Sequence, residues 1–339
     1  MKRISVVFCL TALLVTGCGK KEPIKGSRDI FAMDTYMNLQ AYGDAPEDAL
    51  EKAETEILRL EKLLSVTDNK SETYKLNASG GSPTEVDADV SELIRYGIDM
   101  GKKTKGSLDI TVYPVLREWG FTTGEYNIPT DGRIDELLKN VDYSKIILDE
   151  NTVTLPVGAE VDFGAVAKGF TSDRVMEIFK ENGVSSAIIS LGGNVQTMGR
   201  KTDGSLWKVA VVDPFDTDKT LGIIETADKA VITSGNYERY FTGEDGRNYC
   251  HIIDPSTGRP AENGLVSVTI IGESGLMCDA LSTAIFVMGR DKAVDFWRSY
   301  DDFEMILVES NGNIVITDGI EDSFENLSGL DLEVIAHES

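Results

Sequence analysis

The sequence predicts an α+β fold with mixed, largely antiparallel sheets and packed helices. Short runs rich in valine and isoleucine occur along the whole chain. Many come in consecutive pairs separated by turn residues such as Asn311-Gly312, which is typical of antiparallel hairpins rather than repeated βαβ units. Segments with helical periodicity are intermixed with these runs. No GxGxxG turn follows a strand and no GxxxxGK[ST] loop occurs, so a Rossmann nucleotide fold is not expected.

The elements are expected in the following order. Residues 27–42 alternate as a strand pair or one long strand. Asp44 is expected to cap the next helix, with Glu47 three residues later, and this helix has one apolar face made by Leu50, Ala53, Ile57, Leu60 and Leu64. Further helices are expected at 90–103, 168–182, 276–288 and 291–299. Gly183 is expected to end the helix at 168–182, and Gly289 the helix at 276–288. Strands are expected at 145–148, 187–191, 208–212, 230–233, 249–254, 266–271, 305–308 and 313–317.

The N-terminus has the pattern of a bacterial lipoprotein signal, residues 1–17. Two basic residues precede an apolar run, residues 4–14, which is too short to span a membrane. Small residues then precede Cys18, as in a lipobox; the alternative is an ordinary signal peptide that contains a cysteine. We expect a lipid on Cys18, a tether at 18–26 and a folded domain at 27–339. The mature protein would then be anchored to the bacterial cell membrane by acyl chains, on the extracytoplasmic side.

The charge and the cysteine and histidine content exclude several classes of function. The formal net charge is −24, and it becomes −26 without the signal, which argues against nucleic-acid binding. A polyanionic ligand would need a cation or local basic residues. The chain has two histidines and no CxxC, so a zinc site is not expected. Cys250 and Cys278 remain after processing, and nothing in their spacing requires them to pair.

One predicted helix offers oxygen ligands for a cation. Asp279 and Thr283 are four residues apart in CDALSTAIFVMG, and therefore lie on the same face of the helix. A carboxylate and a hydroxyl in this arrangement suit Mg²⁺. The alternative is that Asp279 caps the helix and the nearby hydroxyls bond back to helix carbonyls.

The segment DFGAVAKGF, residues 162–170, combines glycines with polar groups. Gly164 and Gly169 bracket an expected strand-to-helix turn, where backbone groups can face a ligand. Asp162 is an acceptor at this turn, and Lys168 is the local cation for a phosphate. The alternative reading makes Asp162 an N-cap and Lys168 a solvated surface residue.

Three further segments have both a functional and a structural interpretation. The residues Gly192, Gly193 and Asn194 end a strand and suit either a backbone close to a ring or phosphate, or a tight turn. The aromatic segment 119–121, Trp119-Gly120-Phe121, could stack on a ligand or pack in the core. His251 lies in a strand-like run three residues before Asp254. Either of these two residues could be a base, and a structural role for His251 is the main alternative.

Taken in order, these blocks resemble the signatures of the FAD:protein FMN transferases, the ApbE family. The similarity covers residues 32–289 and includes AMDTYM, LDITVYPVLREWGF, DFGAVAKGF, SLGGN, ITSGNYERYF, HIIDPSTGRP and the DALSTA helix. It implies an FAD-binding, Mg²⁺-dependent enzyme. Such an enzyme moves the FMN moiety of FAD to a threonine of an acceptor flavoprotein, such as a subunit of a membrane redox complex, and releases AMP.

The resemblance also implies roles for individual residues. The positions that match flavin-contacting sites are Met33, Trp119, Gly120, Phe121, Asp162, Lys168 and Ile253. Those that match metal ligands are Ala165 (through its carbonyl), Asp279 and Thr283. Two positions depart from the pattern. Thr67 stands where many relatives have tyrosine, which puts that contact in doubt. Some relatives have an acidic residue in place of Lys168, which argues against a catalytic role for it.

Three functions are compatible with these residues. The first is FMN transfer to a threonine. The second is an FAD pyrophosphatase in which water replaces the threonine and the products are FMN and AMP. The third is a non-enzymatic flavin-binding lipoprotein or solute receptor. Retained FAD, free FMN with AMP, or flavin linked to a co-expressed acceptor would distinguish them.

The lipobox predicts how the protein is held at the membrane. We expect Cys18→Ser to abolish lipid attachment and to release a soluble protein that still binds FAD, because the tether lies outside the folded unit. Membrane fractionation with metabolic labelling by a fatty acid tests this. Retention of the Cys18→Ser protein in the membrane fraction would show that another segment anchors it.

Overall fold

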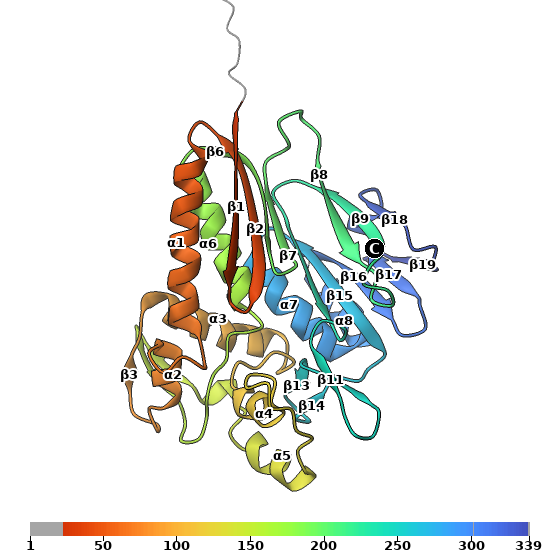
Figure 1. The fold of residues 1–339 in the computed structure, drawn as a ribbon. Coiled ribbons are helices and arrows are strands. Elements are labelled where there is room, and N and C mark those ends of the chain that lie inside the picture. Colours follow the sequence, from red (N-terminus) through yellow and green to blue (C-terminus); the bar gives the residue numbers. More distant parts are fainter. Residues whose placement is uncertain (1–22, 301, 338–339) are drawn as a thin grey trace, which may run out of the picture.

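In the computed structural model, which describes residues 23–300 and 302–337, the chain forms a nine-stranded sheet with helices on one face and a smaller sheet on part of the other (Figure 1). Neighbouring strands run antiparallel except for the last pair. The predicted α+β class is therefore confirmed. In spatial order the strands are β1 (Ile24–Ala32), β2 (Thr35–Gly43), β6 (Val184–Leu191), β7 (Asn194–Met198), β10 (Ala230–Gly235), β15 (Leu265–Gly272), β16 (Phe303–Glu309), β17 (Ile314–Thr317) and β19 (Leu332–Ile335).

The remaining strands form smaller sheets. The sheet that packs on the large one has the order β18 (Phe324–Asn326), β9 (Thr220–Thr226), β8 (Trp207–Val212). A second small sheet has the order β3 (Thr84–Glu85), β5 (Thr152–Thr154), β4 (Ile147–Asp149), and two hairpins pair β11 (Tyr240–Thr242) with β12 (Asn248–Cys250) and β13 (Ile253–Asp254) with β14 (Arg259–Pro260). The strand expected at 249–254 is thus interrupted. His251 lies at a bend between β12 and β13 and not inside a strand.

All the helices expected from periodicity are present, and three short ones were not expected. The helices are α1 (Pro46–Leu64), α2 (Glu72–Asn77), α3 (Ala88–Lys103), α4 (Tyr113–Glu118), α5 (Asp131–Leu138), α6 (Ala167–Glu181), α7 (Gly275–Met288) and α8 (Arg290–Arg298). The missed helices are α2, α4 and α5, which are too short to show a clear period. The prediction that Asp44 caps α1 was wrong. The N-cap is Ala45, without a side-chain bond, and Pro46 opens the helix, where its fixed φ is favourable.

The N-terminal residues form a hairpin of β1 and β2. The strand pair expected for residues 27–42 is confirmed, but β1 begins at Ile24, so residues 24–26 belong to the fold and not to the expected tether. The turn between the strands is made by Met33 and Asp34, which have φ values of 50° and 58°. Positive φ is costly for residues other than glycine. The backbone N–H of Met33 donates to Glu61 of α1 at 2.7 Å, which helps to hold this conformation.

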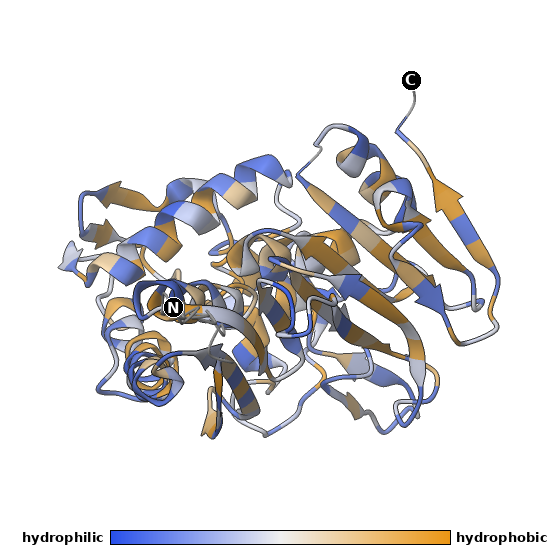
Figure 2. Cartoon of the chain, turned by 90° about the horizontal axis from the view of Figure 1, so that it is seen from above, coloured by the Kyte–Doolittle hydropathy of each residue, from blue (hydrophilic) through white to orange (hydrophobic). Residues whose placement is uncertain are grey.

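The large sheet buries both of its faces against different layers. In β10, Ile232 packs with the helices α7 and α8, whereas its neighbour Val231 packs with the smaller sheet. Figure 2 shows the corresponding alternation of hydrophobic and hydrophilic bands along many strands. This two-residue period places successive side chains on opposite faces. Helices α1 and α6 cover the end of the sheet formed by β1, β2 and β6.

Helices α6 and α7 approach each other closely because two glycines meet between them. A Cβ added at Gly169 would lie 2.2 Å from the carbonyl oxygen of Gly275, and one added at Gly275 would lie 2.7 Å from the carbonyl oxygen of Gly169. Any larger residue at either position would push the helices apart. The contact places the start of α6 against the side of α7 that carries Asp279.

Asp173 of α6 holds the first turn of α7. Its carboxylate accepts hydrogen bonds from the hydroxyl of Ser274 at 2.8 Å and from the backbone N–H groups of Gly275 at 2.7 Å and Leu276 at 3.0 Å. Ser274 is itself the N-cap of α7. The free donors of the helix N-terminus are therefore satisfied by a neighbouring helix. The alternative in which Asp279 caps this helix is wrong, because Asp279 lies inside it. Its second part is confirmed for Ser282, whose hydroxyl donates to the carbonyl of Asp279 at 2.9 Å.

Within residues 23–300 and 302–337, none of the helices combines the length and the apolar character needed to cross a bilayer. The segment 1–22, which contains the expected signal and Cys18, lies outside the described residues. The lipid anchor therefore stays a prediction.

The glycine contact between α6 and α7 predicts a stability effect. We expect Gly169→Ala to destabilise the protein by about 1–3 kcal/mol, because the new methyl group overlaps the backbone of α7. Urea unfolding followed by circular dichroism measures this. Gly132→Ala in α5 is the matched control, because its Cβ would meet no atom within 4 Å. Equal stability of the two variants would contradict the proposed close packing.

Candidate active site

A cavity of about 950 Å³ opens beside the N-terminal end of α6. Its walls come from the β1–β2 turn, the segment 162–168, the turn after β6, the end of β10 and the loop after β12. This volume is at the upper end of the range for ligand sites. Of the residues proposed from the sequence, it is lined by Met33, Phe121, Asp162, Ala165, Lys168, Gly192, Gly193, His251, Ile253, Asp279 and Thr283.

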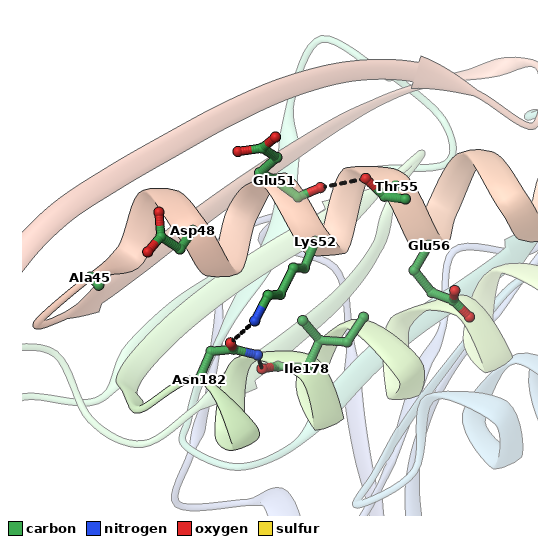
Figure 3. Close-up of a pocket in the computed structure, with 8 residues that line it drawn as sticks. All are labelled: Ala45, Asp48, Glu51, Lys52, Thr55, Glu56, Ile178 and Asn182. Atoms are coloured by element: carbon green, nitrogen blue, oxygen red, sulfur yellow. Dashed lines mark hydrogen bonds between the residues drawn. The ribbon is translucent and has the colours of Figure 1, made fainter.

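A second hollow lies between α1 and the end of α6 (Figure 3). Two of its polar side chains, Lys52 and Asn182, bond to each other. Lys52 donates to Asn182, and Asn182 donates to the carbonyl of Ile178 at 2.7 Å. None of the residues proposed from the sequence lies there. The larger cavity is therefore the candidate active site.

Three oxygen donors that could hold a cation lie in the cavity wall. They are the carboxylate of Asp279, the hydroxyl of Thr283 and the backbone carbonyl of Ala165, whose residues line the same space. Among the described residues there is no cluster of three histidine, cysteine or acidic side chains suited to a metal. The mixed set of carboxylate, hydroxyl and carbonyl is nevertheless of the kind that hard cations bind.

Asp279 is held in position by its neighbours. Its two oxygens accept hydrogen bonds from the backbone N–H of Gly169 at 2.8 Å and from the amide of Asn194 at 2.9 Å. Burial raises the pKa of the Asp279 carboxyl, while the charge of Lys168 opposes that rise. Asn194 is buried and does not line the cavity. Its contribution is to orient Asp279, and not the direct ligand contact expected from the sequence.

Two cations face the interior of an otherwise acidic protein. Lys168 lies on the first turn of α6 and lines the cavity. Arg239 also lines the cavity, and its guanidinium donates to the carbonyl of Phe121 at 2.8 Å. Asp162 lines the same wall and accepts the N–H of Gly164 at 2.7 Å. It is not an N-cap, because that position is taken by Val166. A phosphate in this cavity would therefore meet local positive charge despite the net charge of −24.

The ring of His251 projects into the cavity and is held through one nitrogen. Its Nδ1 lies 3.1 Å from the carbonyl oxygen of Arg239. If Nδ1 donates its proton to this carbonyl, Nε2 is the nitrogen that can accept a proton. Burial lowers the pKa of His251 to about 4, and the charges of Arg239 and Lys168 contribute to the shift. The imidazole is therefore neutral at physiological pH.

Glu238 is a cavity residue that the sequence analysis did not identify. It follows β10 and lines the cavity. Burial raises the pKa of its carboxyl to about 7, and the charges of Lys168 and Asp279 act on it in opposite directions. Its position in the segment ITSGNYERYF was the available signal, but one carboxylate in that segment does not distinguish a cavity residue from a surface residue.

Several predicted site residues do not line the cavity. Trp119 is buried, and its Nε1 donates to the carbonyl of Gly258 at 2.9 Å. Gly120 has a φ of 85°, and a Cβ there would lie 2.1 Å from the carbonyl oxygen of Glu125, so it shapes the backbone. These two residues support Phe121, which alone of the three lines the cavity.

Thr67 and Asp254 also lie outside the cavity wall. The hydroxyl of Thr67 pairs with that of Ser65 at 3.3 Å. Asp254 accepts hydrogen bonds from the backbone N–H of Ser256 at 2.8 Å and from its hydroxyl at 2.7 Å, which closes a turn at the end of β13. The sequence left open whether His251 or Asp254 is the base. Of the two, only His251 faces the cavity. Cys250 and Cys278 are both buried and free.

Comparison with known proteins identifies the family. The model of the ApbE family matches residues 33–307, which contain every lining residue of the cavity. The chain belongs to the ApbE family. An FAD:protein FMN transferase of Klebsiella pneumoniae is 32% identical over 266 residues, covering 77% of this chain and 82% of the relative. One from Treponema pallidum is 29% identical and covers 94% of both chains.

Solved structures of ApbE proteins have the same fold. The ApbE protein of Thermotoga maritima superposes with a TM-score of 0.83 at 32% identity, covering 88% of this chain and 99% of that one. The flavinyl transferase ApbE of Pseudomonas stutzeri gives a TM-score of 0.81 at 28% identity, covering 90% and 98%. The resemblance to the ApbE family that the sequence predicts is thus confirmed. The curated relatives are transferases, and the chain is an enzyme of the same class.

The environment of His251 predicts an unusual titration. We expect its pKa near 4, because the cavity disfavours the imidazolium. An NMR titration of a His337→Gln protein, which keeps His251 as its one histidine, measures it. Since the unfolded chain binds this proton with a pKa near 6.5, the histidine lowers the stability of the folded state as the pH falls from 6.5 to 4.

The same effect should disappear in His251→Asn. This variant should lose less stability than the parent protein between pH 7 and pH 4.5, as thermal melting measures. A pKa of 6 or higher for His251 in the NMR titration would contradict the burial of its imidazole.

Proposed function

We propose that this protein transfers the FMN moiety of FAD to a threonine hydroxyl of an acceptor flavoprotein, releases AMP and depends on Mg²⁺. The observation that supports this most strongly is the composition of one cavity. The cavity is lined by the cation Lys168, by the oxygen donors Asp279 and Thr283, and by His251, whose imidazole is neutral. The names of the relatives as FAD:protein FMN transferases agree with this chemistry.

The donor set suggests where the metal would bind. Asp279, Thr283 and the carbonyl of Ala165 would hold Mg²⁺, and phosphate oxygens of FAD would complete its ligands. When bound, the ion neutralises the charge that develops on a pyrophosphate as it is cleaved. The positive charge of Lys168 would also neutralise charge on the pyrophosphate. Asn194 donates to Asp279 and so keeps its carboxylate in position.

The threonine hydroxyl needs help to react, because it is a weak nucleophile. In the proposed reaction its oxygen forms a bond to the phosphorus on the FMN side of the pyrophosphate. The bond from that phosphorus to the bridging oxygen breaks, and AMP leaves with the electron pair. Nε2 of His251 accepts the hydroxyl proton as the new bond forms. With a pKa of about 4 in the protein without ligand, the imidazole is a weak base, so the negative charge of the bound pyrophosphate would have to raise this pKa toward neutral pH for efficient proton transfer.

The cellular setting is part of the same proposal. With a lipid on Cys18 the enzyme would stand on the extracytoplasmic side of a bacterial membrane, where the acceptor threonine would have to be exposed. A subunit of a membrane redox complex is the kind of acceptor that meets this requirement.

A transfer assay tests the proposal. The protein is incubated with FAD, Mg²⁺ and a soluble fragment of a membrane redox subunit that carries the acceptor threonine, and the fragment is analysed by mass spectrometry. The expected result is a covalent FMN adduct on the threonine, with one AMP released for each adduct. Release of FMN and AMP without an adduct would favour the pyrophosphatase, and recovery of intact FAD would favour a binding protein.

The metal assignment predicts the effect of one substitution. We expect Asp279→Ala to lower FMN transfer at limiting Mg²⁺ by at least about 100-fold, because it removes the one charged donor of the proposed set. Initial rates over a range of Mg²⁺ concentrations measure this. Asp291→Ala on α8, an exposed carboxylate, is the control and should keep the parent rate. Near-normal activity of Asp279→Ala at limiting Mg²⁺ would refute the assignment.

A further inference from the structure

Two exposed aromatic side chains flank the turn that enters the cavity. Phe31 and Tyr36 are 73% and 60% exposed and lie directly opposite each other in the β1–β2 ladder. The residues between them in sequence include Met33, Asp34 and Thr35, which line the cavity. The aromatic pair itself is outside the lining. It therefore stands at the rim of the active site without being part of its interior.

The end of this sheet face that carries the pair is uncovered. The opposite face of the hairpin packs on α1 and α6 through residues such as Ile30 and Met37. Among the described residues, the apolar cluster between the large and smaller sheets includes side chains of β6 and β7 but none of β1 or β2. Figure 1 shows β8 and β9 beyond β7. The smaller sheet reaches the hairpin only at its other end, where Trp207 of β8 lies 6.2 Å from Tyr42 of β2 between ring centroids. Contiguous exposed apolar surface is a common feature of interaction sites.

Tyr36 is held by hydrogen bonds to its neighbours. Asp29 accepts hydrogen bonds from the hydroxyl of Tyr36, which lowers the pKa of the Asp29 carboxyl, and from the amide of Asn38 at 2.6 Å. The carbonyl of Tyr36 accepts the backbone N–H of Gly192 at 3.1 Å. The bond with Gly192 ties the hairpin to a cavity wall, and the bond from Met33 to Glu61 ties it to α1. A rigid aromatic surface loses little conformational entropy on binding.

We propose that Phe31 and Tyr36 form the docking site for the acceptor polypeptide, beside the point where its threonine enters the cavity. This inference rests on the function proposed above. The partner segment presents an apolar or aromatic side chain to the pair. It has no acidic side chain facing Asp29 or Asp34, which are exposed at the same rim and would repel one.

The position of the pair favours an acceptor over a lipid surface. The N-terminal segment that carries Cys18 joins the sheet at Ile24, and Phe31 lies seven residues further along β1, roughly 23 Å away at the rise of a strand. The pair therefore lies at the far end of the strand from the proposed anchor. Continuity with the cavity through Met33 and Thr35 is what an acceptor chain requires and a bilayer contact does not.

Direct binding of the acceptor separates docking from chemistry. The probe is the threonine-bearing fragment of the transfer assay, labelled with fluorescein and titrated against the protein by anisotropy without Mg²⁺. We expect Phe31→Ser and Tyr36→Ser each to weaken binding by about tenfold, and the double variant by more. In transfer assays KM for the fragment should rise while kcat at saturating fragment, and FAD affinity from flavin fluorescence quenching, stay unchanged.

The control is Ile147→Ser on β4, because this apolar side chain is 64% exposed and lies outside the cavity wall. It should change none of these quantities. Melting curves should show that all variants remain folded at the assay temperature, since the replaced side chains are exposed.

Each possible outcome is decisive for the docking surface. Unchanged fragment binding by the folded double variant would overturn it, even if transfer proceeds normally. In that case, loss of self-association in sedimentation would assign the pair to a second copy of the chain. Loss of binding to phospholipid vesicles would assign it to the membrane. Weakened fragment binding would support docking even if the parent protein transferred no FMN, a result that would overturn only the proposed function.

Discussion

The backbones of α6 and α7 touch where Gly169 faces Gly275, and the geometry of the cavity follows from that contact. The absence of side chains lets the N–H of Gly169 reach the carboxylate of Asp279. Asp173 then binds the first turn of α7 from the same face of α6. A buried carboxylate needs several such partners, because burial without them is costly. Helix packing thus orients the carboxylate of Asp279, which we propose as a cation ligand.

The electrostatics of the site differ from those of the surface. The chain as a whole is strongly acidic, yet Lys168 and Arg239 both face the cavity. Burial acts on the groups around them in opposite directions. It lowers the pKa of His251 and raises that of Glu238, so both are pushed toward their neutral forms. The two local cations suit a phosphate-bearing ligand better than the net charge of the chain suggests, although Asp34, Asp109, Asp162 and Asp279 line the same cavity.

The β1–β2 turn connects the interior of the site with its rim. Met33 and Asp34 adopt backbone conformations that cost about 1 kcal/mol or more each for residues other than glycine. The bond from Met33 to Glu61 and the bond from Gly192 to Tyr36 offset this cost. The same turn contributes lining residues to the cavity and presents an aromatic pair outside it. One rigid element can therefore align the ligand inside with a polypeptide outside.

The sequence by itself determined the elements whose information is local. Apolar periodicity located the five longest helices, and runs rich in valine and isoleucine located strands such as β6, β10 and β15 but not β7 or β9. The four-residue spacing of Asp279 and Thr283 placed them on one helix face. Short helices such as α4 were missed because a few residues do not define a period. The family signatures identified the region of the site, because their glycines and polar residues interrupt the pattern of a core.

Only the tertiary structure decided which of these residues share the cavity. Trp119 packs inside because Gly258, 139 residues away, accepts its N–H, and Asn194 turns to Asp279 across 85 residues. His251 faces the cavity because the chain bends between β12 and β13, whereas Asp254 closes a turn outside it. Glu238 became visible as a cavity residue only in the folded chain. Such contacts depend on distant partners, so the orientation of a side chain follows from packing and not from its neighbours in sequence.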